Sequence, residues 1–212
     1  MPGHECGGHC EHGHDHEHRS ETEIGLQYSL YQKIDLAHVV CLNEAVDGSG
    51  KTVFKPWDQR LERERFVESD VDAELLMNVP FAGNVKLKAL IVIGGDGLAH
   101  PKLVRLHKNK PQMTFDDTGM EADQEFELSQ DSQGVLEYSL KATKFSSVFH
   151  LSLHFPTNYG EGETSTKIYY IGLKGDFLSE HKDSIILATY EARPMPQDHK
   201  GELPEIGRHQ IS

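Results

Sequence analysis

The chain has 212 residues, of which 37% are hydrophobic, and a formal net charge of −13 from 34 acidic and 21 basic side chains. This length fits one domain with terminal extensions. The negative charge argues against direct nucleic-acid binding, which depends on neutralising phosphates, and against binding to an anionic membrane surface. Apolar runs stay shorter than the ~18 residues of a membrane span, and the polar first residues give no secretory signal.

The N-terminal stretch, residues 1–23, has no apolar periodicity and no Phe, Trp or Tyr, which predicts a disordered tail. It is rich in imidazole and thiol groups, the usual ligands of zinc, copper and nickel. After removal of the initiator Met, the amine of Pro2, two backbone amides and the His4 imidazole would suit copper(II) or nickel(II). The alternative is a low-complexity tail that chelates metal incidentally, and we expect no cofactor to be required. The candidate metal ligands are His4, Cys6, His9, Cys10, His12, His14, His16 and His18.

Cysteine usage indicates a reducing compartment. Cys6, Cys10 and Cys41 are an odd set with two members in the tail, so they do not resemble a disulfide framework. We therefore expect the protein in the cytoplasm and nucleus. Cys41 lies in the apolar run 39–42 with no basic neighbour, which predicts a small buried hydrophobe and not a reactive thiol.

Short apolar stretches along the chain predict a series of strands. Residues 85–93 are the most apolar and are expected to form the central strand of the core. Turn signals separate the stretches, and no long amphipathic helix is predicted. This pattern indicates an all-β sandwich or barrel with short helices, and a jelly roll fits the strand count. The other predicted strands are residues 102–107, 126–128, 135–140, 145–155 and 167–173, the last ending at Gly172 and Gly175.

The C-terminal stretch becomes Pro-rich and polar after Ala192, so residues 193–212 are predicted to form a second flexible tail. Its end is a candidate contact for a partner, and the alternative is a passive disordered end. The residues of this candidate contact are His209, Gln210, Ile211 and Ser212.

The segment from Phe66 through Glu74-Leu75-Leu76 to Val85-Lys86-Leu87 resembles the PITH domain, the C-terminal module of the proteasome-interacting thioredoxin. Residues 41–44, 111–116 and 148–172 are also similar to that family, so we expect a PITH domain over residues 24–192. The resemblance implies a β-sandwich jelly roll similar to galactose-binding-like domains, and association with the regulatory particle of the 26S proteasome. The thioredoxin half and its Cys-x-x-Cys are absent, so oxidoreductase activity does not carry over.

Carboxylates and imidazoles in the expected core show no catalytic arrangement. Asp70, Asp72 and Glu74 lack the spacing of a calcium loop and are interpreted as caps and turns. Asp116 and Asp117 are adjacent, so on a strand they would point to opposite faces. His150 and His154 share one strand face and are expected at the surface. We therefore expect a protein that is not an enzyme.

Three functions remain open from the sequence. The first is a monomeric protein-interaction module that binds the proteasome regulatory particle or its associated proteins. The second is metal handling through the N-terminal tail. The third is small-ligand or carbohydrate binding by loops at one end of the sandwich, with Trp57 and Tyr159 as candidate aromatic platforms. Trp57 could equally fill the end of the sandwich.

Overall fold

Eight antiparallel strands dominate residues 23, 25 and 27–180, the part of the chain that the computed structural model describes. Five short 3-10 helices accompany them, one before β1 and four between later strands: η1 (Ser29–Lys33), η2 (Gly50–Val53), η3 (Trp57–Gln59), η4 (Gly97–Ala99) and η5 (Phe115–Asp117). The strands are β1 (Val40–Leu42), β2 (Val67–Glu68), β3 (Leu75–Gly94), β4 (Leu103–Lys108), β5 (Gln124–Glu127), β6 (Tyr138–Ser139), β7 (Val148–Phe155) and β8 (Lys167–Glu180).

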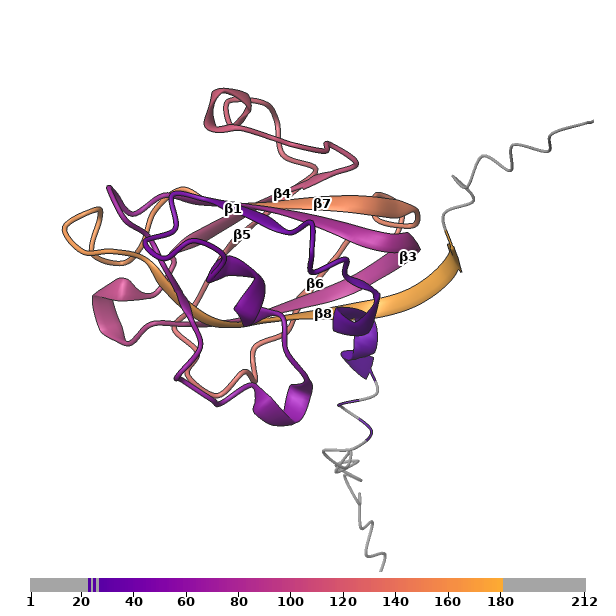
Figure 1. Cartoon of the computed structure of the whole chain (residues 1–212), viewed down its shortest axis with the longest axis horizontal. Helices are drawn as coiled ribbons and strands as arrows, with labels where there is room; N and C mark the ends of the chain where they lie inside the picture. The colour runs from indigo at the N-terminus through magenta and orange to yellow at the C-terminus, as the bar shows by residue number, and fades with distance from the viewer. Residues whose placement is uncertain (1–22, 24, 26, 181–212) are drawn as a thin grey trace, which may run out of the picture. The chain divides into compact units, whose positions relative to one another are not determined.

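Strand β3 belongs to two layers. Its first half pairs with β1 and β7, and its second half pairs with β8 and β6. The register shifts between Pro80 and Val85, where the strand passes from one layer to the other. One layer therefore has the order β1-β3-β7-β4-β5 and the other β2-β8-β3-β6, and Figure 1 shows the two layers facing each other. The predicted all-β sandwich is confirmed, and the predicted central strand is the second half of a longer one.

A bulge in β3 decides which side chains enter the core between the layers. Leu87 pairs with Gly175 and Ala89 with Lys174, so Lys88 is an extra residue on β3. A shift of one residue moves every later side chain to the opposite face. Leu87 points into the main core before the bulge, and Leu90 points into the same core after it. Ile91 packs instead in a second cluster on the outer face, against Tyr28, Trp57, Ile93 and Tyr170.

Strand β8 runs past both glycines that were expected to end it. It continues to Glu180, so the predicted end at Gly172 and Gly175 is wrong. Gly175 lies opposite the bulge, where a Cβ atom would stand 2.1 Å from the carbonyl oxygen of Lys86. Glycine is therefore needed because the two backbones approach closely, and it does not mark a turn.

The predicted strand 135–140 is shorter in the structure. Only Tyr138 and Ser139 pair with β3, while Val135 is 76% exposed. The Asp131 carboxylate accepts hydrogen bonds from the amides of Gln133, Gly134 and Leu136 at 2.7–2.9 Å. These bonds hold the preceding residues in a turn, because they occupy amides that a strand ladder would use.

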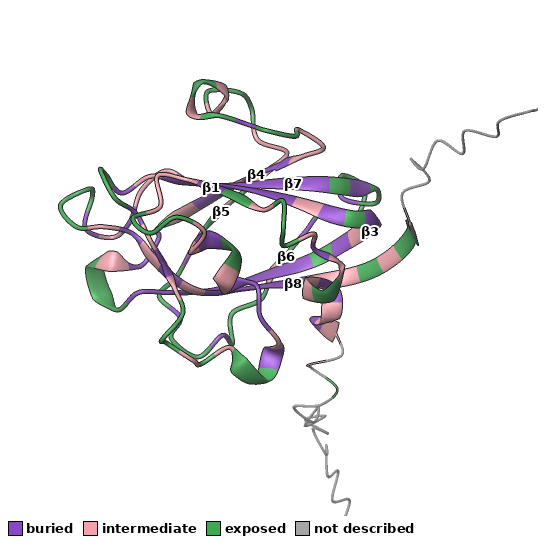
Figure 2. Ribbon diagram, in the orientation of Figure 1, coloured by how far each residue is buried: buried purple, intermediate pink, exposed green. Residues whose placement is uncertain are grey.

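The expectation that His150 and His154 lie at the surface is also wrong, since they are 8% and 1% exposed. The chain after β4 folds over the outer face of the first layer, where the carbonyl of Met113 accepts a hydrogen bond from the side-chain Nδ2 of Asn78. Figure 2 shows β7 as one of the most buried strands. His107 on β4 is fully buried on the same face, and within the described residues neither of its ring nitrogens has a hydrogen-bond partner.

Replacing Gly175 with Ala is expected to lower the free energy of unfolding by about 2–3 kcal/mol, because the added methyl group must displace the Lys86 carbonyl. Gly119 is the matched control. A Cβ atom there meets no atom within 4 Å, so Gly119→Ala should change stability by less than about 0.5 kcal/mol. Urea unfolding of the two variants measures both values. Equal stability of both variants would contradict the close approach of β3 and β8.

Stability is expected to fall as the pH drops below the ordinary histidine pKa of 6.5, and the cause is burial. Burial lowers the pKa of His107 and of His150, and it lowers that of His154 although the Glu74 carboxylate lies 2.6 Å from its Nε2 atom. The unfolded chain therefore takes up protons that the folded chain excludes. Each such proton reduces the unfolding free energy by about 1.4 kcal/mol per pH unit.

Urea unfolding at a series of pH values tests this dependence, and His107→Gln should flatten it. His38→Gln is the control for a surface histidine, because its side chain is 76% exposed. A profile that is identical in wild type and His107→Gln between pH 7.5 and 5.5 would show that the pKa of His107 is the same in the folded and the unfolded chain, contrary to the expected lowering by burial.

Candidate binding groove

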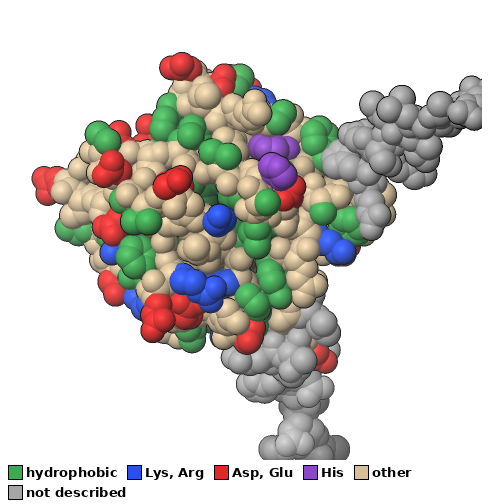
Figure 3. Space-filling model, in the orientation of Figure 1, with side chains coloured by type: hydrophobic (Ala, Val, Ile, Leu, Met, Phe, Trp, Pro, Cys, Tyr) green, Lys and Arg blue, Asp and Glu red, His purple; other side chains and the backbone are tan. Residues whose placement is uncertain are grey.

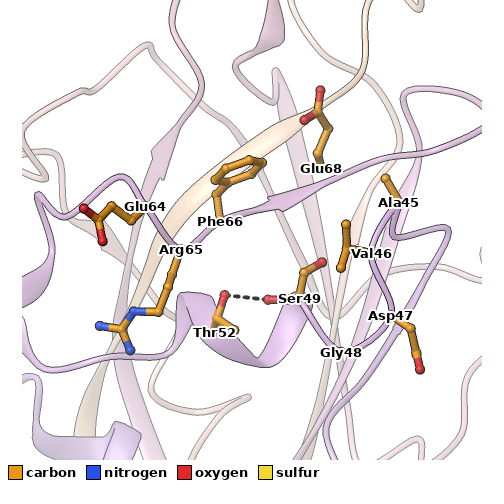
Figure 4. A pocket seen from close by; sticks show the side chains of 10 residues that line it. All are labelled: Ala45, Val46, Asp47, Gly48, Ser49, Thr52, Glu64, Arg65, Phe66 and Glu68. Carbon is orange, nitrogen blue, oxygen red and sulfur yellow. Dashed lines mark hydrogen bonds between the residues drawn. The ribbon is translucent and has the colours of Figure 1, made fainter.

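A groove of about 450 Å³ opens beside β2, and we call it the β2 groove. One wall is the turn after β1, and the other is the chain that enters β2. Figure 4 shows the two walls on opposite sides, with Phe66 on one and Val46 on the other. The lining residues are Ala45, Val46, Asp47, Gly48, Ser49, Thr52, Glu64, Arg65, Phe66 and Glu68.

The first wall is held by the carboxylate of Glu44. Its two oxygens accept hydrogen bonds from the amides of Gly48 and Gly50, both at 2.6 Å, and from the Ser49 hydroxyl at 3.1 Å. A charged acceptor that binds several backbone amides fixes a turn strongly. Cys41 lies behind this turn and is buried, as predicted, and burial raises the pKa of its thiol. The turn therefore has a rigid support, while Val46 at its outer side is 68% exposed.

The second wall is held by the ammonium group of Lys55, whose side chain is only 2% exposed. Its Nζ atom donates to the carbonyl oxygens of Glu62 at 2.8 Å and Arg65 at 3.3 Å, and it lies 3.4 Å from the Glu62 carboxylate. Burial lowers the pKa of this ammonium, and the nearby Glu62 carboxylate opposes that shift. The carbonyl contacts determine where the charged segment after Trp57 ends and β2 begins.

The charges around the groove are mainly acidic. Arg65 is paired with Glu62, with Nη2 and Oε2 2.5 Å apart, and Glu68 lies 3.1 Å from the Lys167 ammonium. Asp47 and Glu64 stand at opposite rims, and within the described residues neither forms an ion pair. The groove thus combines apolar walls with two carboxylates at its edges. Figure 3 shows acidic side chains spread over the face in view, with smaller groups of basic ones.

Trp57 and Tyr159, the two predicted aromatic platforms, belong to different clusters. Trp57 is 8% exposed and stacks on Tyr28, with ring centroids 5.0 Å apart, below a smaller pocket of about 240 Å³. Tyr159 packs edge-on against His100 and donates its hydroxyl to the Leu128 carbonyl at 2.7 Å. Each aromatic ring therefore has its own packing partners, and neither lines the β2 groove.

Some of the other predicted sites lie outside the described residues, and others lie within them. The metal-ligand candidates in residues 1–22 and the contact at residues 209–212 lie outside the described residues. Asp72, interpreted as a turn residue, accepts hydrogen bonds from the Glu74 amide and the Asn43 side chain. Within residues 23, 25 and 27–180, no group of His, Cys, Asp and Glu is arranged to hold a metal ion, and no helix there is long and apolar enough to cross a membrane.

Sequence reasoning did not identify the β2 groove. From the sequence, residues 47–50 indicate only a turn, and the mixed-charge residues 58–65 indicate a solvated loop or short helix. The sequence held one indication for each wall of the groove: Glu44 precedes a glycine-rich turn, and Lys55 is a charged residue within the apolar run 53–57. A lysine in such a run needs partners when buried, and here backbone carbonyls provide them.

Solved structures place this architecture in the class of galactose-binding-like β-sandwich jelly rolls, as predicted. The CBM32-1 and CBM32-2 domains of ZmpB from Clostridium perfringens, in complex with GalNAc, align with a TM-score of 0.53 and 10% identity, covering 75% of this chain and 39% of that one. A second structure, which also contains the M60 catalytic domain, aligns with a TM-score of 0.52 and 11% identity, covering 76% of this chain and 16% of that one. These likenesses concern the fold alone.

The PITH domain family model matches residues 20–194, and the chain belongs to that family. PITH domain-containing protein 1 of Homo sapiens is 48% identical over 206 residues, which cover 97% of this chain and 96% of the relative. The protein of the same name in Danio rerio is 51% identical over 181 residues, 85% of each chain. The Dictyostelium discoideum relative is 38% identical over 199 residues, 93% of this chain and 97% of the relative. The predicted family is confirmed.

Replacing Lys55 with Met should lower the free energy of unfolding by about 2–3 kcal/mol, because the part-buried carbonyls of Glu62 and Arg65 lose a charged donor. Lys51→Met is the matched control, since Lys51 is exposed, and it should cost less than about 0.5 kcal/mol. Chemical denaturation measures both. If Lys55→Met were no more destabilising than Lys51→Met, the ammonium would not be what fixes the second wall.

Proposed function

We propose that this chain is a non-enzymatic protein-interaction module that associates with the regulatory particle of the 26S proteasome, as a monomer in the cytoplasm and nucleus. The observation that carries the interaction role is the β2 groove, whose rigid walls leave Val46 68% exposed. An exposed apolar residue beside a preformed groove favours binding of another protein, because binding buries that surface without reorganising the walls.

The choice of partner rests on family resemblance. The chain belongs to the PITH domain family, and the region from Phe66 to Leu87 resembles the C-terminal module of the proteasome-interacting thioredoxin. The formal charge of −13 favours a basic docking surface on the particle. The end of the chain, His209 to Ser212, is proposed as a secondary contact.

Purified 26S proteasome is expected to retain the full chain in co-sedimentation at about 50 mM salt and to retain less at about 300 mM, because salt screens the attraction between exposed charges. The proteolytic core particle without its regulatory particle is the control and should retain none. A chain ending at Arg208 should bind more weakly if the last four residues contribute. Failure of the 26S particle to retain the full chain at low salt would refute the proposed partner.

Small-ligand or carbohydrate binding is a second candidate, favoured by the pocket beside Trp57. Tyr28 and Trp57 lie on its wall, and Glu137 and Lys174 form an ion pair at its rim, 3.0 Å apart. The buried Nε1 atom of Trp57 has no hydrogen-bond partner within the described residues. Trp57 is the single tryptophan, so a change in fluorescence on titration with N-acetylgalactosamine would favour this candidate.

A further inference from the structure

The backbone of β2 has one open side along the β2 groove. In an antiparallel ladder, successive residues direct their amide and carbonyl groups to alternate sides. The Ser69 amide donates to the Thr166 carbonyl, which continues the pairing of β2 with β8. The backbone amide and carbonyl of Val67 therefore point toward β8 as well, whereas those of Phe66 and Glu68 point to the opposite side.

The opposite side is covered only in part. The amide of Ala45 donates to the Glu68 carbonyl at 2.8 Å, and the amide of Asp70 donates to the Asn43 carbonyl at 3.0 Å. After Ala45 the chain turns away, because Glu44 binds the amides of Gly48 and Gly50. The groove occupies the space left beside Phe66, so an antiparallel pairing begins at Glu68 and stops where the groove opens.

We propose that the β2 groove receives an extended peptide segment of a partner protein, which adds as a strand to the open side of β2 at residues 66–68. An apolar side chain of the segment packs between Val46 and Phe66, and lysine or arginine side chains beside it face Asp47 and Glu64. This inference deepens the proposed function, on which it rests, by naming the chemistry of the partner.

Strand addition explains the features of the groove together. Main-chain hydrogen bonds supply affinity without regard to sequence, and a pocket for every second side chain supplies specificity. The apolar walls accept one inward side chain, and the two unpaired rim carboxylates favour cationic neighbours on either side of it. Because Glu44 and Lys55 already hold the walls, the segment loses conformational entropy on binding and the groove loses little.

Selection of a displayed library of random peptides of about ten residues on the full chain tests the proposal directly. The enriched peptides should carry an apolar residue with lysine or arginine within two positions. Val46→Lys should weaken their binding at least about tenfold, because it removes apolar surface and adds a like charge. Val71→Lys is the matched control, since Val71 is 86% exposed and lies outside the groove, and it should change affinity less than about twofold.

Backbone pairing has its own readout. Methylation of single amide nitrogens along a selected peptide should abolish binding at every second position, because only alternate amides face β2. No enrichment, equal loss with Val46→Lys and Val71→Lys, or insensitivity to methylation would each overturn the proposal. So would a concentration-dependent dimer of the full chain that Val46→Lys dissociates, because the occupant would then be a second copy.

The same variants separate this inference from the proposed partner. If selected peptides bind the groove with these properties while the 26S particle does not retain the chain, the proposed partner fails and the groove's ligand class stands. If the particle retains Val46→Lys as well as wild type and no peptides are enriched, the partner stands and the inference fails.

Discussion

One strand, β3, pairs with neighbours in both layers of the sandwich, and most of the structure follows from that constraint. The first half of β3 supplies the layer with β7, and its second half supplies the layer with β8. The strand passes from one layer to the other after Pro80. The bulge at Lys88 then reverses which side chains point inward, so its apolar residues fill both the central core and the outer cluster around Trp57. Gly175 is needed where the bulged backbone approaches β8 most closely.

The sequence was sufficient to predict the fold class, the family and most strands, because alternation and turn residues are local signals. It did not predict the bulge at Lys88, since two-sided burial makes both parities of residues 89–93 apolar and removes the signal of a face change. The lengths of β8 and β6 were missed for a related reason. Gly175 has a role that only its contact with the distant Lys86 carbonyl defines, and the Asp131 carboxylate binds nearby amides that a strand ladder would use.

Buried polar groups were the least predictable feature. Alternation alone indicated exposure of His150 and His154, because no periodicity connects β7 to the chain segment that covers this face through hydrogen bonds to Asn78 and Ser152. Glu44 and Lys55 are ordinary charged residues in the sequence, yet each holds one wall of the β2 groove. The candidate site is therefore a product of tertiary structure, while Trp57, which the sequence singled out, is mainly a packing residue of the outer cluster.

Rigid support and an incomplete strand edge together make the β2 groove suited to binding another chain. The proposed contact with the proteasome regulatory particle would pass through this groove. Hydrogen–deuterium exchange of the full chain, free and bound to purified 26S proteasome, measures it most directly. Binding is predicted to slow exchange at residues 45–49 and 64–68 while residues 150–154 on the buried histidine face stay unchanged. Slowed exchange elsewhere with none at residues 64–68 would contradict the account.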